Sequence, residues 1–318
     1  MTLSKKPLAI CIMGPTASGK TALAVEFVKR FGCGIVSVDS AMIYRSMDIG
    51  TAKPGPDILA AAPHRLVDIL DPSEKYSAAR FREDALAAMR EITAAGRVPL
   101  LTGGSMLYFD VLQHGISPLP GADPAIRAAL DARALEEGWP ALHAELARLD
   151  PEAALRIKPN DRQRIQRALE VCYISKQPLS ELQRAPTVEA GEYRYLKLAL
   201  APTDRAVLHE IIERRFRSMM QEGFLDEVRG LRARGDLDAS MPSMRAVGYR
   251  QLWEHLEGGC GLEEAVRRGI VATRRYAKRQ LTWLRAESDV RWFDSDASMQ
   301  FVDDACTFAA SHLVASPR

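Results

Sequence analysis

GPTASGKT occupies positions Gly14–Thr21, between a short apolar run (Leu8–Met13) and a segment with apolar residues at helical spacing that ends at Gly32. This order predicts a strand, a glycine-rich loop and a helix. The spacing G-x-x-x-x-G-K-T is typical of the P-loop, in which backbone N–H groups and a helix N-terminus bind phosphate oxygens. A chance match in an ordinary loop is the alternative. The strand and helix patterns on either side of the motif favour the P-loop, because the P-loop needs both and a chance match does not.

Each part of this loop has a predicted role. Gly14 and Gly19 let the backbone come close to an anion, and Lys20 reaches its outer phosphate. The hydroxyl of Thr21 can ligate a Mg²⁺ ion that bridges phosphate oxygens. The loop therefore predicts a bound polyphosphate with Mg²⁺ as cofactor, but it identifies neither the compound nor the bond that is broken.

Length and composition limit what surrounds the loop. With 318 residues, 47% of them hydrophobic, the chain can form a main domain and a smaller one. No apolar run approaches the ~20 residues that cross a bilayer, so we expect no membrane association and a cytoplasmic location. The five cysteines form no CxxC pair and no metal-ligand spacing with histidine, which favours buried thiols. The net charge is only +2, but basic residues concentrate between Arg156 and Arg167 and between Arg267 and Arg285, which favours a large anionic partner.

A second buried strand is predicted at Gly34–Asp39, and it ends on a carboxylate. In open α/β sheets ligands bind at the carboxyl ends of the strands, so Asp39 and the P-loop should face one crevice. Alternatively, Asp39 caps a short helix at Ser40–Tyr44, which is a common role of aspartate.

Strand and helix patterns alternate through the first part of the chain. A third strand is predicted at Arg65–Leu70, and a long amphipathic helix begins after Ser77 and ends at Gly96. RVPLLTGGS then supplies another strand and a glycine turn, followed by a helix at MLYFDVLQHG. This alternation predicts the α/β class: a P-loop NTPase-like parallel sheet flanked by helices.

Proline and glycine interrupt the pattern at Ser117–Pro124, after which the periodic segments are all helical as far as Arg184. The next strand pattern is Tyr193–Leu200, which should rejoin the sheet. We therefore predict a core domain from residues 1–118 and 191–318, and an all-helical insertion domain at 119–190.

The last third of the chain is predicted to be helical. In its longest helix four basic residues follow one outward row: Arg267, Arg274, Lys278 and Arg285. Such a row is commonly no more than a solvated face. Because Tyr276 and Trp283 alternate with it, phosphate contacts and base stacking on a nucleic acid are the second interpretation.

Six blocks in this order resemble the bacterial tRNA dimethylallyltransferase family over nearly the whole chain: GPTASGKT, DSAMIYRSMDIGTAKP, GGSMLYF, KPNDRQRIQRALEV, RAVGYRQLW and AKRQLTWLR. The resemblance implies that dimethylallyl diphosphate, in place of a nucleotide, sits on the P-loop. It also implies transfer of the five-carbon group to N6 of adenosine 37 in the anticodon stem-loop of tRNA. A monomer that does not contact a membrane is expected.

The resemblance also implies roles for individual residues. Asp39 is implied to accept the N6 proton, with Lys20 and Thr21 as the other catalytic residues and Thr21 as the metal ligand. The residues implied to bind diphosphate are Gly14, Pro15, Thr16, Ala17, Ser18, Gly19, Lys20, Thr21 and Arg215. The residues implied to contact tRNA are Asp39, Ser40, Ala41, Met42, Ser105, Arg127, Gln163, Arg164, Ile165, Gln166, Arg167, Arg245, Gly248, Tyr249, Arg250, Lys278, Arg279 and Arg285.

Two departures from the family pattern are visible. The family commonly has threonine after GG where this chain has Ser105, which keeps the hydroxyl but loses a methyl group. The zinc finger of eukaryotic relatives has no counterpart after Arg285. Without the resemblance, a P-loop small-molecule kinase or a nucleotide-dependent RNA-binding protein would be the alternatives. A kinase would need a strand ending in a Mg²⁺-binding aspartate and an arginine-bearing lid, which Asp39 and the helical insertion could imitate.

Overall fold

The computed structural model describes residues 6–184, 191–295 and 300–314. The chain forms two compact units, one from Met1–Gln113 with Gly191–Arg318 and the other from His114–Ala190. The first boundary thus falls after Gln113, whereas the sequence suggested residue 118. Among the described residues, no helix is long and apolar enough to cross a membrane.

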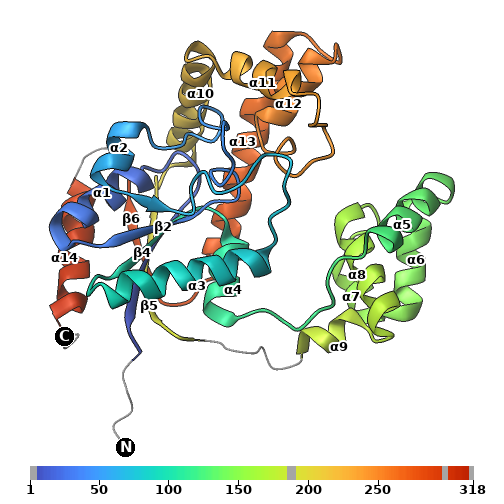
Figure 1. The fold of residues 1–318 in the computed structure, drawn as a ribbon, viewed down its shortest axis with the longest axis horizontal. Coiled ribbons are helices and arrows are strands. Elements are labelled where there is room, and N and C mark those ends of the chain that lie inside the picture. Colours follow the sequence, from blue (N-terminus) through green and yellow to red (C-terminus); the bar gives the residue numbers. More distant parts are fainter. Residues whose placement is uncertain (1–5, 185–190, 296–299, 315–318) are drawn as a thin grey trace, which may run out of the picture. The chain divides into compact units, whose positions relative to one another are not determined.

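The first unit contains a six-stranded sheet with the order β3-β2-β4-β1-β5-β6, in which every neighbouring pair is parallel (Figure 1). The central strands are buried on both faces, as their continuous apolar sequences require. The predicted parallel α/β sheet is therefore confirmed. The strands are β1 (Leu8–Met13), β2 (Gly34–Val38), β3 (His64–Arg65), β4 (Pro99–Gly103), β5 (Arg194–Ala201) and β6 (Val290–Asp294).

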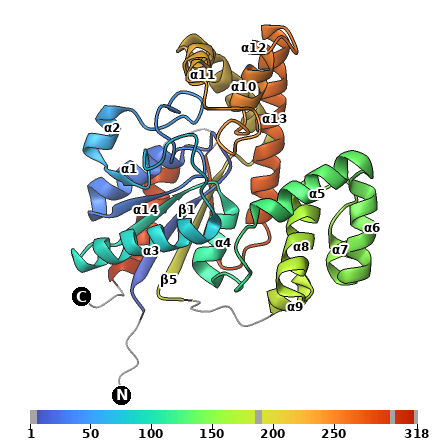
Figure 2. The same cartoon turned by 45° about the vertical axis from the view of Figure 1, so that its right-hand side comes forward.

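Helices cover both faces of this sheet (Figures 1 and 2). Helices α1 and α14 pack together on one face around Phe27, and α3 lies on the other. The Ser77 side chain caps α3 by accepting the N–H of Arg80, as predicted. The helices of this unit are α1 (Lys20–Phe31), α2 (Pro56–Ala61), α3 (Ala78–Ala94), α4 (Met106–His114), α10 (Arg205–Gln221), α11 (Phe224–Ala233), α12 (Tyr249–Leu256), α13 (Leu262–Leu284) and α14 (Gln300–Val314).

The third strand is much shorter than the sequence predicted. Leu66 and Asp68 have φ values of +62° and +56°, in the left-handed region that a strand cannot continue through. Of the residues in this predicted strand, β3 (His64–Arg65) includes only Arg65, which pairs with β2, and Leu70 forms an isolated bridge with Tyr44. The prediction of a strand over 65–70 is therefore wrong for most of its length.

Two further predictions need correction. The segment after Asp39 forms turns and not a helix, so Asp39 caps no helix there. The last third of the chain is not wholly helical, because Val290–Asp294 forms β6 beside β5 at the edge of the sheet. Only Phe293 of β6 is buried, so this strand lacks the long apolar run by which buried parallel strands are recognised.

Helices α10 to α13 form a second core in the first unit. Phe216, Phe224 and Tyr249 stack edge to face at its centre. Gly269 of α13 lies against this cluster, and a Cβ there would come within 2.3 Å of the Phe216 ring. The close approach fixes α13 against α10, and α13 then extends to the loops at the carboxyl ends of the strands.

The second unit is a small helical domain with its own core, and it corresponds to the helical insertion that the sequence predicts. Leu142, Leu146 and Ile165 lie at its centre and are fully buried. Aspartates 123, 150 and 161 cap three of its helices by accepting backbone N–H groups. The helices are α5 (Pro124–Glu136), α6 (Trp139–Leu149), α7 (Pro151–Arg156), α8 (Arg162–Ser175) and α9 (Leu179–Arg184).

Candidate active site

The P-loop connects the end of β1 to the start of α1. Gly14 is required for space, because a Cβ there would lie 2.2 Å from the carbonyl oxygen of Leu200 in β5. Ala17 and Gly19 adopt left-handed backbone angles, with φ of +68° and +84°, which turn the chain into α1. Among the described residues, no side chain caps the N-terminus of α1, so its N–H groups and positive end remain for an anion.

Lys20 is the first residue of α1, and its Nζ donates to the carbonyl oxygen of Pro15 at 2.6 Å. Burial and, to a smaller extent, the charge of Arg215 lower the pKa of Lys20 to about 7, whereas the charge of Asp39 opposes the shift. Burial also lowers the pKa of Arg215. Two partly buried cations thus line one cavity, which favours a bound anion that would stabilise both charged forms.

The loop also presents hydroxyl groups. Ser18 is buried, and its Oγ has no hydrogen-bond partner among the described residues. A buried hydroxyl without a partner is costly unless a ligand satisfies it. Thr21 lines the same cavity, and its hydroxyl oxygen fits Mg²⁺, which takes one or two protein oxygens together with phosphate oxygens and water. Within the described part of the chain, no cluster of three His, Cys, Asp or Glu side chains forms a metal cage.

Asp39 follows β2 directly and has a fixed orientation. Its Oδ1 accepts the backbone N–H groups of Ala41 at 2.8 Å and Met42 at 3.2 Å. No described residue donates to Oδ2, so this oxygen is left as an acceptor. The carboxylate therefore holds the turn that follows it through Oδ1 and also lines the cavity.

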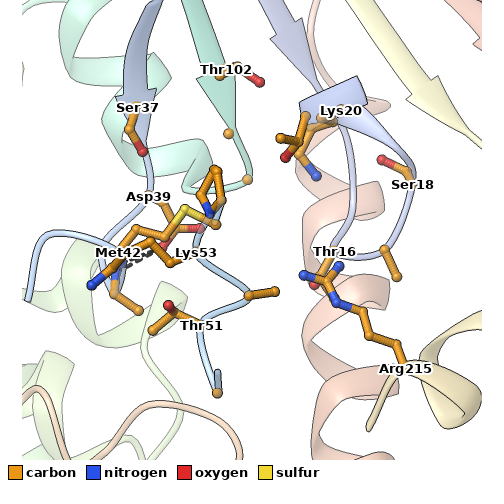
Figure 3. Close-up of a pocket in the computed structure, with 18 of the residues that line it drawn as sticks. Thr16, Ser18, Lys20, Ser37, Asp39, Met42, Thr51, Lys53, Thr102 and Arg215 are labelled. Atoms are coloured by element: carbon orange, nitrogen blue, oxygen red, sulfur yellow. Dashed lines mark hydrogen bonds between the residues drawn. The ribbon is translucent and has the colours of Figure 1, made fainter. Parts of the chain in front are cut away.

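A cavity of about 1000 Å³ joins these groups at the carboxyl ends of β1, β2 and β4. Figure 3 shows Asp39 and Met42 on one wall, and Lys20, Ser18 and Arg215 on the opposite wall. Gly14 and Pro15, the first two residues of the loop, are buried and do not line the cavity. The other residues predicted to bind diphosphate all line it: Thr16, Ala17, Ser18, Gly19, Lys20, Thr21 and Arg215.

One wall of the cavity is a loop whose conformation depends on residues that the sequence analysis did not single out. Glu227 of α11 accepts the N–H groups of Asp48, Ile49 and Gly50, and its carboxylate also accepts the Tyr249 hydroxyl. Lys53 lies across the same loop, where its buried Nζ donates to the Tyr44 carbonyl and to two carboxylates. No local pattern marks Glu227, because the backbone N–H groups that it accepts are almost 180 positions away.

Gln280 of α13 is a second residue that the sequence analysis missed. It is 3% exposed and hydrogen-bonded both to the P-loop and to the loop after β4. Its only sequence signal is its position as a polar residue within the buried face formed by Ile270, Ala277 and Leu284. Tyr276, one turn earlier, also lines the cavity, with the Arg279 guanidinium 5.6 Å from its ring centroid.

The residues predicted to contact tRNA are distributed over several surfaces. Ser105 lies beside the cavity, and its Oγ accepts the N–H of Ser40 at 3.1 Å. The serine that this chain has in place of the family's threonine therefore makes a hydrogen bond through its hydroxyl. Arg250, Lys278 and Arg285 are exposed in the first unit, and Gln163 and Arg164 are exposed in the second. Those that line the cavity are Asp39, Ser40, Ala41, Met42, Arg245, Tyr249 and Arg279.

Two of these predicted residues are buried in the described fold. Ile165 is fully buried in the core of the helical unit and presents no surface to a ligand. Gly248 is also buried, and a Cβ there would lie 2.8 Å from the Phe224 ring. Its φ of +94° explains the glycine as a backbone requirement of the turn into α12.

Three other polar residues from these predictions are held by internal partners. Arg127 and Arg167 both pair with Glu170, which is fully buried and therefore needs their charge. Gln166 donates to the carboxylate of Asp131 at 2.7 Å. These contacts orient the three side chains, whereas Gln163 and Arg164 nearby are exposed.

The outward row predicted on α13 is also incomplete. Arg274 does not point into solvent, because its guanidinium pairs with Glu213 at 2.8 Å and donates to the His209 carbonyl. Arg267 pairs with Glu264 on its own helix. Lys278 and Arg285 remain exposed.

The parallel sheet, the glycine loop before α1 and the cavity at the carboxyl edge define a P-loop α/β protein with a helical insertion. The family model described as IPP transferase matches residues 42–287, which is more than half of the chain. The chain belongs to this family. It is 56% identical over 312 residues to the tRNA dimethylallyltransferase of Thioalkalivibrio sulfidiphilus (strain HL-EbGR7), covering 98% of this chain and 96% of the relative.

Solved structures agree with this assignment. The full-length tRNA isopentenylpyrophosphate transferase of Bacillus halodurans matches with a TM-score of 0.71 and 37% identity over 96% of each chain. The Staphylococcus epidermidis tRNA delta(2)-isopentenylpyrophosphate transferase matches with a TM-score of 0.69 and 33% identity, over 96% of this chain and 100% of that one. A eukaryotic dimethylallyltransferase acting on tRNA shares the fold, with a TM-score of 0.82 and 23% identity over 98% of this chain and 80% of that one.

Proposed function

We propose that this protein transfers the dimethylallyl group of dimethylallyl diphosphate to N6 of adenosine 37 in the anticodon loop of tRNA and releases diphosphate. The observation that best supports the proposal is that two partly buried cations, Lys20 and Arg215, line the same cavity as the carboxylate of Asp39. The names of the relatives from Thioalkalivibrio and Bacillus support tRNA as the acceptor.

The cationic wall suits the leaving group. As the bond between the allylic carbon and the diphosphate oxygen breaks, negative charge grows on the diphosphate, and fixed donors there lower the barrier. The N–H groups of the P-loop, the ammonium of Lys20 and the guanidinium of Arg215 are such donors. Thr21 would hold a Mg²⁺ ion, which would supply further positive charge to the departing diphosphate.

The opposite wall suits the acceptor. The N6 lone pair of adenine is delocalised into the ring, so the amino group is a weak nucleophile. In our proposal the carboxylate of Asp39 accepts a hydrogen bond from N6–H and takes that proton as the N6–C bond forms. The amides of Ala41 and Met42 hold Oδ1, so Oδ2 is the oxygen that we assign to the proton.

The size of the cavity and the charge of the surface are consistent with a nucleic-acid substrate. About 1000 Å³ is at the upper end of the range for ligand pockets, so we infer that a base turned out of its stack enters beside the diphosphate. Exposed Arg164 and Lys278 are candidates for contacts with tRNA phosphates.

The test is a two-substrate assay. The protein is incubated with Mg²⁺ and unmodified tRNA, and receives either dimethylallyl diphosphate or ATP. We expect prenylated tRNA and one equivalent of diphosphate in the first reaction, and no phosphorylated product in the second. Consumption of ATP in place of the allylic diphosphate would reject the proposal in favour of a P-loop kinase.

A further inference from the structure

A single side chain joins two of the loops that form the cavity. The Oε1 atom of Gln280 accepts the N–H of Thr16 in the P-loop at 2.9 Å. Its Nε2 atom donates to the carbonyl oxygen of Gly104, in the loop after β4, at 2.8 Å. Both bonds are buried or partly buried, so the amide is fixed at both ends with little competition from water.

The slot that receives this amide is closely fitted. A Cβ at Gly104 would lie 2.1 Å from Nε2 of Gln280 and 3.3 Å from the carbonyl oxygen of Gly14. The φ of Gly104 is not positive, so the glycine is explained by the lack of space and not by a left-handed turn. Any larger residue at position 104 would displace the Gln280 amide.

The same network reaches the loop that carries Asp39. Ser105 follows Gly104, and its Oγ accepts the backbone N–H of Ser40, the residue after Asp39. The loops after β1, β4 and β2 are therefore linked in the order in which these strands lie in the sheet. Tyr276 lies one turn before Gln280 on α13 and lines the same cavity.

We propose that Gln280 is a positioning residue that fixes the separation between the P-loop and the loop bearing Asp39. This role rests on the proposed function, in which an allylic carbon held by the diphosphate must meet an acceptor held by Asp39. Reacting groups need close alignment, and a displacement of about 1 Å can reduce the rate about 10²-fold. A positioning residue should therefore affect the transfer step more than the binding of either substrate.

The test compares two ways of breaking the link. Gln280→Leu removes both hydrogen bonds at similar volume, and Gly104→Ala displaces the amide while leaving Gln280 in the sequence. For each variant we expect the single-turnover rate of transfer to fall about 10²-fold. The dissociation constant for dimethylallyl diphosphate should change less than about threefold, since the other loop donors remain.

A second measurement does not depend on activity. Hydrogen exchange at the Thr16 amide should become at least about tenfold faster in both variants, because its acceptor is lost. Gln113→Leu is the matched control: Gln113 is also buried, and its Nε2 has no hydrogen-bond partner in the described part of the chain. This control should keep the transfer rate and the Thr16 exchange rate of the unaltered protein.

Each contrary outcome is informative. Transfer by Gln280→Leu within about threefold of the unaltered protein would overturn the positioning role and leave the proposed function intact. A fall in affinity equal to the fall in rate would also overturn it, because Gln280 would then only complete the diphosphate site. Failure of the unaltered protein to prenylate tRNA would overturn both proposals.

Discussion

Asp39→Asn separates proton transfer from the structural role of the same side chain. Asn can keep its amide oxygen on the N–H groups of Ala41 and Met42, and as a cap it is about as good as Asp. Its NH₂ group then replaces Oδ2, so the variant has no oxygen that can accept the N6 proton. The substitution therefore removes the base and keeps the turn.

The magnitudes can be compared directly. Changing two hydrogen bonds from a charged to a neutral acceptor costs at most about 2 kcal/mol of folding free energy. Loss of a positioned base commonly costs about 10² to 10⁴ in rate, or roughly 2.7 to 5.4 kcal/mol of barrier. The Asp39 charge also lies near Lys20. Removing this negative charge should leave the affinity for dimethylallyl diphosphate unchanged or raise it.

The assay is single-turnover transfer to tRNA with both substrates saturating, together with the melting temperature and the dissociation constant for the diphosphate. Asp204→Asn is the control, because Asp204 accepts the N–H of Ala206 at 2.7 Å in a similar cap at the start of α10. We expect this control to transfer the group at the rate of the unaltered protein. A rate for Asp39→Asn within about fivefold of the unaltered protein, far below the expected loss, would refute the assignment of Asp39 as the base.

Three other predictions follow from single contacts. Because burial lowers the pKa of Lys20 to about 7, the affinity for dimethylallyl diphosphate without tRNA should fall as the pH rises above 7, and equal affinity at pH 6.5 and 8.5 would contradict this. Calorimetry at pH 8.5 should also detect proton uptake when the diphosphate binds, and Lys20→Arg should abolish that uptake. Lys278→Ala should reduce the slope of log affinity for tRNA against log salt concentration by about 0.7 to 0.9, because one phosphate contact is lost. Arg274→Ala breaks the pair with Glu213, so it should lower the melting temperature and leave that slope unchanged. Glu227→Gln should lower the free energy of unfolding by about 2 to 3 kcal/mol in a denaturant titration, since the carboxylate accepts three backbone N–H groups. An unchanged denaturation midpoint would disprove the role of Glu227 in fixing the loop at residues 48–50.

The sequence alone determined the features that depend on local order. The P-loop was predicted because its glycines and Lys20 follow a strand and begin a helix, and all of these signals lie within adjacent segments. Asp39 was placed at the cavity because the carboxyl ends of parallel strands meet at one edge. The all-helical insertion was predicted because the periodicity of its apolar residues and the residues that cap its helices are also local signals.

Only the tertiary structure decided the features that depend on distant partners. Gln280 contacts Thr16 across 264 positions, and Glu227 contacts Asp48 across 179, so no local pattern could pair them. A polar residue on the buried face of a helix indicates that some partner exists but not which one. The burial of Ile165 and the pairing of Arg274 with Glu213 likewise became visible only when neighbouring helices packed, because exposure and charge pairing are properties of the assembled surface.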